Sequence, residues 1–114
     1  MGIDDQSHKI ILIDFDTAAS YKDSITEQHI QLSENNKPTG DLNFISISSH
    51  LGSSQSRRDD LESLCYILFY FLNGTLPWMV SSEENADNRL VEIGNQKMEV
   101  VLQETFTDVP YCFF

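Results

Sequence analysis

Two aspartates one residue apart, Asp14 and Asp16, flank Phe15 directly after an apolar run of the sequence. Carboxylate oxygens are the ligands that Mg²⁺ and Ca²⁺ prefer, so the pair is a candidate cation site. Taken alone, such a pair more often marks the polar end of a buried strand. An EF-hand loop is excluded because its sixth and twelfth positions, counted from Asp14, are Ala19 and Ile25 instead of Gly and Glu. A glycosyltransferase Asp-x-Asp site is disfavoured because no nucleotide-binding βαβ pattern surrounds the pair.

A short strand and a long loop are expected to position this pair. Residues 8–14 contain the continuous apolar run Ile-Ile-Leu-Ile, which predicts a strand buried on one or both faces. Residues 17–45 are rich in Ser, Thr, Asn and Lys, and Pro38 and Gly40 interrupt them, so a long polar loop is predicted. A loop of this length in a compact domain is usually functional or disordered.

The strongest helical signal in the sequence covers residues 57–73. Ser56, three residues before Asp59, is suited to cap the N-terminus of this helix. From Leu61 onwards apolar residues occupy nearly every side, which predicts a central helix that is buried all round. An Asn-Gly pair ends the pattern. A second helix is predicted at about 84–94.

The composition indicates one small, acidic domain. The 114 residues carry a formal net charge of -11, which should repel nucleic acid phosphates and anionic membranes, so neither is expected as a partner. The two cysteines, Cys65 and Cys112, lack the Cys-x-x-Cys spacing of a zinc site. Without a secretory signal they indicate a reducing intracellular compartment, cytoplasmic or nuclear. His8, His29 and His50 are dispersed and are interpreted as ordinary polar or packing residues.

The motifs from the Asp-Phe pair to the end of the long helix together resemble the casein kinase 1 family of eukaryotic Ser/Thr protein kinases. The resemblance runs from residue 8 to about residue 105. Its most specific part is the ten-residue stretch QSRRDDLESL, residues 55–64. The other matching motifs are HI (29–30), EN (34–35), TG (39–40), HLG (50–52), LPW (76–78) and KM (97–98).

The resemblance implies a mainly α fold. The chain would be a fragment of the lower lobe (C-lobe) of a protein kinase, with a short β element and the activation segment at its N-terminal end. Residues 1–114 would form a partial kinase domain. Its activation segment would cover residues 14–52, its central helix 57–73, and a following lower-lobe helix about 84–94.

The resemblance also implies roles for individual residues. Asp14 would bind the Mg²⁺ that sits on the ATP phosphates, and Phe15 would pack beneath that site. Asp60, at the start of the central helix, would be the buried aspartate that accepts hydrogen bonds from the backbone of the catalytic loop. Trp78 and Arg58 would be structural, Trp78 by packing at the end of the central helix. Mg-ATP would be the cofactor, and a protein would be the substrate or partner.

The substrate loop departs from the family pattern. Where the family has Thr-Gly-Thr-Ala-Arg-Tyr, this chain has Thr39, Gly40, Asp, Leu, Asn43 and Phe, so Asn43 replaces the anion-binding arginine. Asp16 replaces the glycine that follows Asp-Phe, which restricts the backbone and adds a second negative charge. After Leu-Pro-Trp the family's lysines and arginines are replaced by MVSSEENADN. Positive charge for an acidic or phosphorylated substrate is therefore expected to be nearly absent.

Three catalytic parts of the family have no counterpart in these 114 residues: the Gly-rich loop, the strand lysine and the His-Arg-Asp loop. The N-lobe and the catalytic base are expected to be absent, because the chain starts with a Met-Gly pair that the family carries just after its catalytic loop. The apolar cluster at 111–114 suggests an interruption there too. Three hypotheses follow, one of which is a pseudogene-like product without a role. The chain is part of a casein kinase 1-type kinase, inactive and without a cofactor on its own, or it is a pseudokinase remnant that acts as a protein-interaction module.

Overall fold

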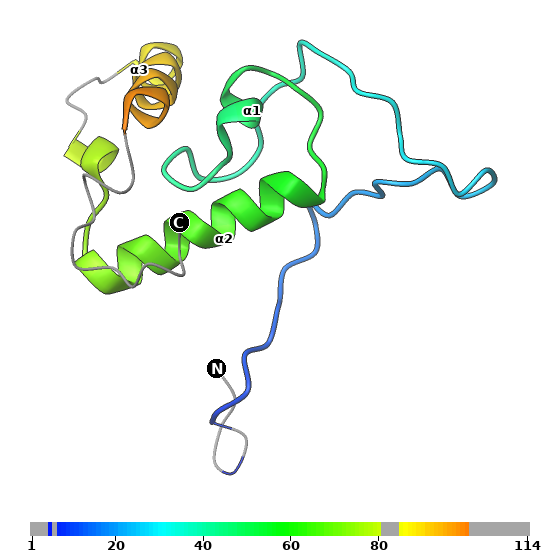
Figure 1. The fold of residues 1–114 in the computed structure, drawn as a ribbon, viewed down its shortest axis with the longest axis horizontal. Coiled ribbons are helices and arrows are strands. Elements are labelled where there is room, and N and C mark those ends of the chain that lie inside the picture. The colour runs from blue at the N-terminus through cyan, green and yellow to red at the C-terminus, as the bar shows by residue number, and fades with distance from the viewer. Residues whose placement is uncertain (1–4, 6, 81–84, 101–114) are drawn as a thin grey trace.

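The computed structural model describes residues 5, 7–80 and 85–100 of the chain, and within these residues the fold is mainly helical. The elements are α1 (Ile47–His50), α2 (Arg57–Asn73), the 3₁₀ helix η2 (Pro77–Val80) and α3 (Ala86–Glu99). α3 packs against α1 and η2, and α2 runs beneath them (Figure 1). The mainly α fold that the sequence predicts is therefore observed.

The long helix α2 begins and ends where the sequence predicts. At its start the Asp59 carboxylate accepts a hydrogen bond of 2.7 Å from the backbone N–H of Ser56. At its end Gly74 adopts the left-handed conformation, with φ of 76°, and its N–H donates to the Tyr70 carbonyl at 2.7 Å. Glycine is suited to this position because it has no Cβ to clash in the left-handed region.

A small aromatic core joins α2, η2 and α3. Its buried members are Tyr66, Phe69, Leu76, Trp78 and Ile93. The rings of Tyr66 and Trp78 meet edge to face, with centroids 5.1 Å apart. Burial of each such side chain contributes about 1.5–3 kcal/mol, so this cluster is the main apolar stabilisation of the fold.

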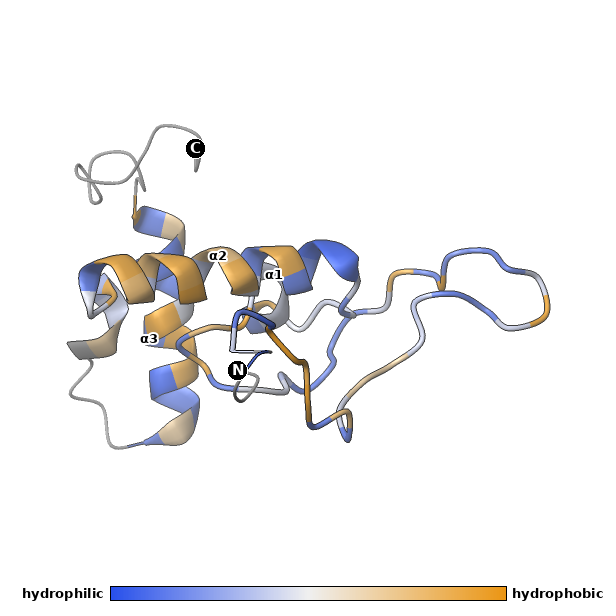
Figure 2. Cartoon of the chain, turned by 90° about the horizontal axis from the view of Figure 1, so that it is seen from below, coloured by the Kyte–Doolittle hydropathy of each residue, from blue (hydrophilic) through white to orange (hydrophobic). Residues whose placement is uncertain are grey.

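The prediction that α2 is buried on all sides is wrong for the described residues. Only Tyr66 and Phe69 of its apolar residues are buried, whereas Phe71 is 74% exposed and Leu61 and Leu64 are also exposed. Figure 2 shows that the helix is hydrophobic along most of its length after a polar first turn. Ile67, Leu68 and Tyr70 are partly buried, so the described elements cover one side of α2 and leave the other apolar side chains exposed.

The prediction of a strand at residues 8–14 is also wrong. This segment belongs to the N-terminal arm (residues 7–16), which runs away from the helices without regular structure (Figure 1). Its apolar side chains are exposed, and Ile10 reaches 88%. A strand needs a second strand beside it to pair its backbone, and the structure describes no strand paired with the arm. The single β-bridge of the described residues pairs Lys22 with His29.

The remaining predictions of secondary structure are close to the observed fold. Residues 17–45 form a long irregular segment, as predicted. The helix expected at about 84–94 is observed as α3, which extends to Glu99. Its N-terminus is capped by Asn85, whose side chain accepts from the Asp87 N–H at 2.9 Å. The apolar cluster at 111–114 lies outside the described residues.

Candidate functional site

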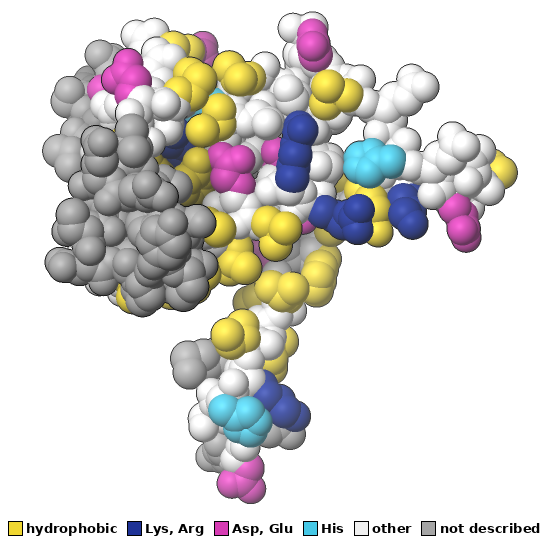
Figure 3. All heavy atoms as spheres, in the orientation of Figure 1, with side chains coloured by type: hydrophobic (Ala, Val, Ile, Leu, Met, Phe, Trp, Pro, Cys, Tyr) yellow, Lys and Arg dark blue, Asp and Glu magenta, His cyan; other side chains and the backbone are white. Residues whose placement is uncertain are grey.

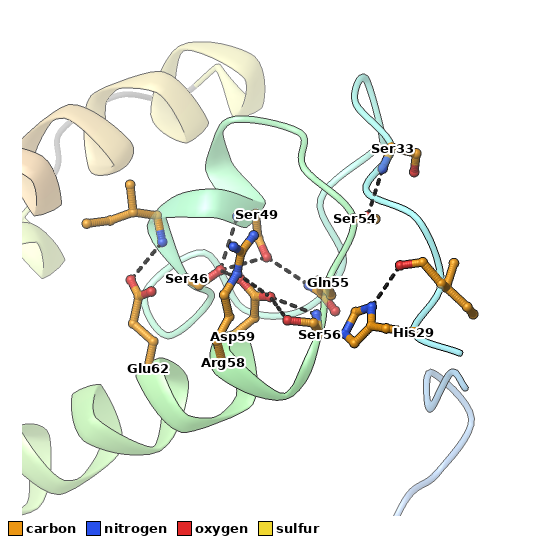
Figure 4. A network of polar contacts seen from close by, with 12 residues as sticks. His29, Ser33, Ser46, Ser49, Ser54, Gln55, Ser56, Arg58, Asp59 and Glu62 are labelled. Atoms are coloured by element: carbon orange, nitrogen blue, oxygen red, sulfur yellow. Dashed lines mark hydrogen bonds and ion pairs between the residues drawn. The ribbon is translucent and has the colours of Figure 1, made fainter. Parts of the chain in front are cut away.

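The best-built polar site of the described residues surrounds the Asp59 carboxylate at the start of α2. Asp59 is only 3% exposed. One of its oxygens, Oδ1, accepts from the Ser46 hydroxyl at 2.6 Å, and Oδ2 accepts from the Ser56 N–H at 2.7 Å. The Arg58 Nε lies 3.5 Å from Oδ2. Figure 4 shows these groups converging between α1 and α2, so one carboxylate joins both helix starts.

Hydroxyl and amide groups extend this site into the loops on either side. Ser49 donates its N–H to the Ser46 hydroxyl at 3.1 Å, which caps α1. The Gln55 amide donates to the Ser49 hydroxyl at 3.0 Å. Farther out, the Ser54 N–H donates to the Ser33 carbonyl at 2.8 Å. The path of the chain between α1 and α2 is thus fixed by hydrogen bonds from several segments (Figure 4).

Asp59 is held as a charged carboxylate. Burial raises the pKa of Asp59, but the hydrogen bonds from Ser46 and Ser56 and the nearby Arg58 guanidinium lower it, and the net pKa lies below the ordinary 3.8. A carboxylate that accepts several donors remains ionised at neutral pH. Its charge therefore strengthens the hydrogen bonds that it accepts from Ser46 and Ser56.

Glu62, one turn along α2, makes a second connection to α1. Its Oε1 accepts from the Ile47 N–H at 2.8 Å and from the Tyr66 hydroxyl at 2.7 Å. Burial, together with Glu62, raises the pKa of the Tyr66 phenol, so Tyr66 stays protonated as a donor. α1 is therefore attached to α2 at two successive turns.

The segment before α1 forms a compact turn, residues 41–45, which corresponds to the predicted substrate loop. The Asp41 carboxylate accepts from the Asn43 N–H at 2.8 Å, which is a typical way for aspartate to begin a turn. The buried Trp78 indole donates to the Asn43 carbonyl at 2.9 Å. Lys97 of α3 donates to the Ile45 carbonyl at 2.6 Å. The turn is thus held from both η2 and α3.

The other predicted residues of the substrate loop lie just before this turn. Gly40 has φ of 112°, and a Cβ there would lie 3.0 Å from the Ile45 Cγ2, so both backbone and space favour glycine. The Thr39 carbonyl lies 3.5 Å from the Gln55 amide nitrogen. Both residues are exposed.

A pocket of about 640 Å³ lies between the loop at 17–39 and the segment 49–58. The described residues that line it include Lys37, Arg58 and His29 but no Asp or Glu, and hydroxyl and amide side chains provide much of the rest. Figure 3 shows several Lys and Arg side chains gathered beside a His at the base of the projecting loop. Lys37 and Arg58 thus bring positive charge to a pocket that Thr39 of the predicted substrate loop also lines. The sequence predicted that positive charge would be nearly absent around that loop.

The predicted metal ligand lies apart from this site. Asp14 is exposed on the N-terminal arm, in the left-handed conformation with φ of 64°, and Phe15 is 67% exposed. Hydrophobic side chains line much of this arm in Figure 3. Among the described residues, no group of three or more His, Cys, Asp or Glu is arranged to hold a metal ion. The Asp14 carboxylate could therefore contribute to a Mg²⁺ site only together with ligands that the described residues do not place beside it.

The expected burial of Asp60 is not observed, and the buried carboxylate is that of its neighbour Asp59. Successive helix residues point about 100° apart, so only one of the two can face α1. Arg58 lies beside Asp59, with its side chain largely exposed. Trp78 is fully buried in the aromatic core.

Sequence reasoning identified Asp59 only as part of the Ser56 cap, which is observed, and missed its contact with α1 as well as the roles of Lys97 and His50. The Ser56-x-x-Asp59 spacing was a signal for Asp59, because a carboxylate at the third helical position can accept from the capping residue. Nothing in the sequence around Lys97 or His50 indicates their contacts, because these join segments about fifty residues apart. Such contacts depend on tertiary packing.

The described residues contain no helix with the length and apolar character needed to span a bilayer. The model of the fungal protein kinase family matches residues 3–72, which is more than half of the chain. The match covers the N-terminal arm, the long loop, the Asp59 site and nearly all of α2. The chain therefore belongs to the fungal protein kinase family.

Proposed function

We propose that the chain supplies the activation segment and central helix of a Ser/Thr protein kinase domain of casein kinase 1 type. In such a domain Mg-ATP is the phosphoryl donor and a Ser or Thr hydroxyl of a protein is the acceptor. Membership of the fungal protein kinase family supports the kinase relationship. The in-register motifs of residues 29–78, above all the stretch 55–64, support the casein kinase 1 type.

One observation carries this proposal: the stretch with the most specific resemblance is also the best-organised polar site of the fold. Residues 55–64 contain Ser56, Asp59 and Glu62, which together hold α1 against the start of α2. The turn at 41–45 is held beside them by buried contacts. A substrate segment of a kinase has to be held at a fixed place relative to the reacting groups, and this framework provides such support.

We further propose that Asp14 is the Mg²⁺ ligand of the assembled domain and that these 114 residues alone transfer no phosphate. When bound, the metal would neutralise charge on the β- and γ-phosphates. Asp14 would contribute one carboxylate, and Asp16 would add negative charge beside it. Single carboxylates hold Mg²⁺ weakly, and among the described residues no group of three or more His, Cys, Asp or Glu is arranged to hold the ion.

A chimaeric kinase tests this proposal. Residues 14–73 of the chain would replace the corresponding segment of an active casein kinase 1-type enzyme, which supplies the Gly-rich loop, the strand lysine and the catalytic base. We expect Mg-dependent phosphorylation of a Ser/Thr peptide that falls at least about 100-fold in Asp14→Asn. Thr17→Ala, at the residue directly after the arm, is the matched control and should retain activity. A folded chimaera whose activity is the same with and without the Asp14 carboxylate would contradict the assignment.

A second candidate function, a protein-interaction module of pseudokinase type, is favoured by the exposed apolar surface. Leu61, Leu64 and Phe71 on α2 and the isoleucines of the arm face outwards. Surfaces of this kind usually mark contacts with other polypeptides. This candidate predicts that the chimaera folds and yet transfers no phosphate, even after Asp16→Gly restores the family glycine. Activity of the Asp16→Gly chimaera would rule out the interaction module as its only role.

A further inference from the structure

Lys97 carries a cationic group that is buried beneath the turn at 41–45. Its side chain reaches from α3, and its Nζ donates to the Leu42 carbonyl at 2.8 Å and to the Ile45 carbonyl at 2.6 Å. The Nζ also lies 4.8 Å from the Tyr66 ring centroid and 5.3 Å from that of Trp78. Carbonyl oxygens and ring faces stabilise a cation, so the contact suits a charged ammonium group.

His50 completes this contact from α1. Its Nε2 lies 3.2 Å from the Lys97 Nζ, and its Nδ1 lies 3.0 Å from the Leu90 carbonyl. An ammonium group can only donate, so the Nε2 must be unprotonated to accept from it. The ring proton then sits on Nδ1 and donates to the Leu90 carbonyl. The contact with the Lys97 ammonium therefore fits a neutral imidazole, whereas a protonated Nε2 would donate to the Leu42 carbonyl, which also lies 3.2 Å away.

We propose that His50 and Lys97 form a proton-operated clamp: with neutral His50, Lys97 holds the turn at 41–45 against α3, and protonation of His50 releases Lys97 from that turn. Protonation removes the acceptor of one Lys97 hydrogen bond and places two positive charges 3.2 Å apart. The protonated Nε2 would also compete for the Leu42 carbonyl, which lies 3.2 Å away. Both effects weaken the hold of Lys97 on the turn.

The charged and titratable groups around the clamp do not remove this effect. From α2, Glu62 faces both His50 and Lys97, but its Oε1 already accepts from the Ile47 N–H and from Tyr66. From the turn, Asp41 attracts Lys97, but its Oδ1 already accepts from the Asn43 N–H. Tyr66 remains protonated because its pKa is raised.

The direction of the pH dependence follows from the same surroundings. Burial and Lys97 lower the pKa of His50 below its ordinary 6.5, while the Leu42 and Leu90 carbonyls and Glu62 partly oppose the shift. Burial lowers the pKa of Lys97 to about 8, with Glu62 and Asp41 opposing, so Lys97 is mostly charged at neutral pH. Between pH 6.5 and the lowered pKa of His50, the released state binds more protons than the clamped state. The equilibrium constant that favours the clamped over the released state therefore falls on acidification, by up to about tenfold per pH unit.

Trp78 provides a direct measurement of the clamp. It is the single tryptophan of the chain, it is fully buried, and its indole N–H donates to the Asn43 carbonyl within the turn. We would titrate the full ¹⁵N-labelled chain by NMR from about pH 7.5 to about pH 5 and follow the His50 ring and the Trp78 indole. Both signals should change with one shared midpoint, which lies below 6.5.

Hydrogen exchange tests the release itself. The Phe44 and Ile45 amides donate to the Asp41 carbonyl and report on the turn. After correction for the intrinsic pH dependence, their protection should fall by up to about tenfold per pH unit between pH 6.5 and the lower His50 midpoint, and level off below it. Amides in the middle of α2 should keep their protection over the same range.

Variants separate the clamp from general acid effects. His50→Gln keeps a hydrogen-bonding group without a titrating ring and should make the Trp78 signal independent of pH. Lys97→Met removes the neighbouring cation and should move the His50 midpoint upwards. His29→Gln, at an exposed histidine, is the matched control and should leave the transition unchanged.

Two outcomes would overturn the proposal. One is a His50 ring that titrates without any response of the Trp78 indole and the Ile45 amide in the wild-type chain. The other is a response that persists in folded His50→Gln. If circular dichroism shows that His50→Gln is unfolded, the titration of the wild-type chain alone tests the proposal, because it requires no substitution.

Discussion

At the residue scale, the fold distinguishes two adjacent aspartates by their surroundings alone. Asp59 is buried among the Ser46 hydroxyl, the Ser56 N–H and Arg58, whereas Asp60 is exposed one position later. Both occupy the first turn of α2, where a negative charge is favourable. Only Asp59 is therefore committed to joining α1 and α2, and Asp60 remains available on the surface.

Replacement of Asp59 by asparagine should destabilise the chain far more than the same change at Asp60. The amide loses the charge that strengthens the bonds from Ser46 and Ser56, so we expect Asp59→Asn to lower the free energy of unfolding by about 1.5–3 kcal/mol. Asp60→Asn should change it by less than about 0.5 kcal/mol. Urea unfolding of the two variants measures both values. Equal effects would contradict the assigned role of Asp59.

Asp59 should also contribute to the loss of stability in acid. Its pKa is lowered in the folded chain, so its contribution is present above the unfolded value of 3.8 and is lost as pH falls through the folded pKa. The wild-type chain should therefore lose more unfolding free energy than Asp59→Asn between about pH 5 and about pH 2.5. Urea unfolding at a series of pH values measures this. Parallel acid profiles for the two proteins would show that Asp59 is not the responsible group.

At the element scale, local signals identified the helices and failed for the strand. The bounds of α2 followed from its capping residues and the Asn-Gly stop, all of which act within one turn of the helix ends. The run at 10–13 has the composition of a strand, but a strand also needs a partner, and the described residues provide none there. The predicted second helix ended too early because Lys97 has the character of an exposed polar residue. In the structure Lys97 is buried, since its ammonium group donates to the carbonyls of Leu42 and Ile45.

The C-terminal stop of α2 depends on the left-handed glycine. A Cβ at Gly74 would meet no atom within 4 Å, so Gly74→Ala is affected only by the backbone conformation. We expect the alanine variant to lose about 1–2 kcal/mol of unfolding free energy. Gly74→Asn should lose less, because asparagine adopts this conformation more readily. Thermal unfolding of both variants checks the order. Alanine no worse than asparagine would show that the positive φ is not what fixes the helix end.

At the scale of the whole molecule, the described fold covers one side of α2 and leaves the other open. α1, η2 and α3 gather on one side with the turn at 41–45, and the N-terminal arm extends away from them (Figure 1). The exposed apolar residues of α2 and the arm, among them Leu61, Phe71 and Ile10, are thus open to contact with another polypeptide. A surface of this kind favours association with another polypeptide.

Phe71 is the most exposed large apolar residue of α2, so it tests that surface. We expect the purified chain to self-associate in a concentration-dependent way and Phe71→Glu to reduce this association without loss of unfolding free energy. Leu51→Glu, at an exposed leucine outside α2, is the matched control. Sedimentation velocity measures the association. A monomeric wild-type chain, or equal effects of the two substitutions, would contradict an associating surface on α2.

The most direct test of the central claim is calorimetric titration of Mg-ATP into the 114-residue chain. We propose that the turn at 41–45 and its contacts with α2 and α3 support a kinase substrate segment, and among the described residues no group of three or more His, Cys, Asp or Glu is arranged to hold a metal ion. We therefore expect no saturable binding up to about 1 mM Mg-ATP, and identical traces for wild type and Asp14→Asn. Saturable, magnesium-dependent binding that is lost in Asp14→Asn would contradict it, because these residues alone would then form a nucleotide site.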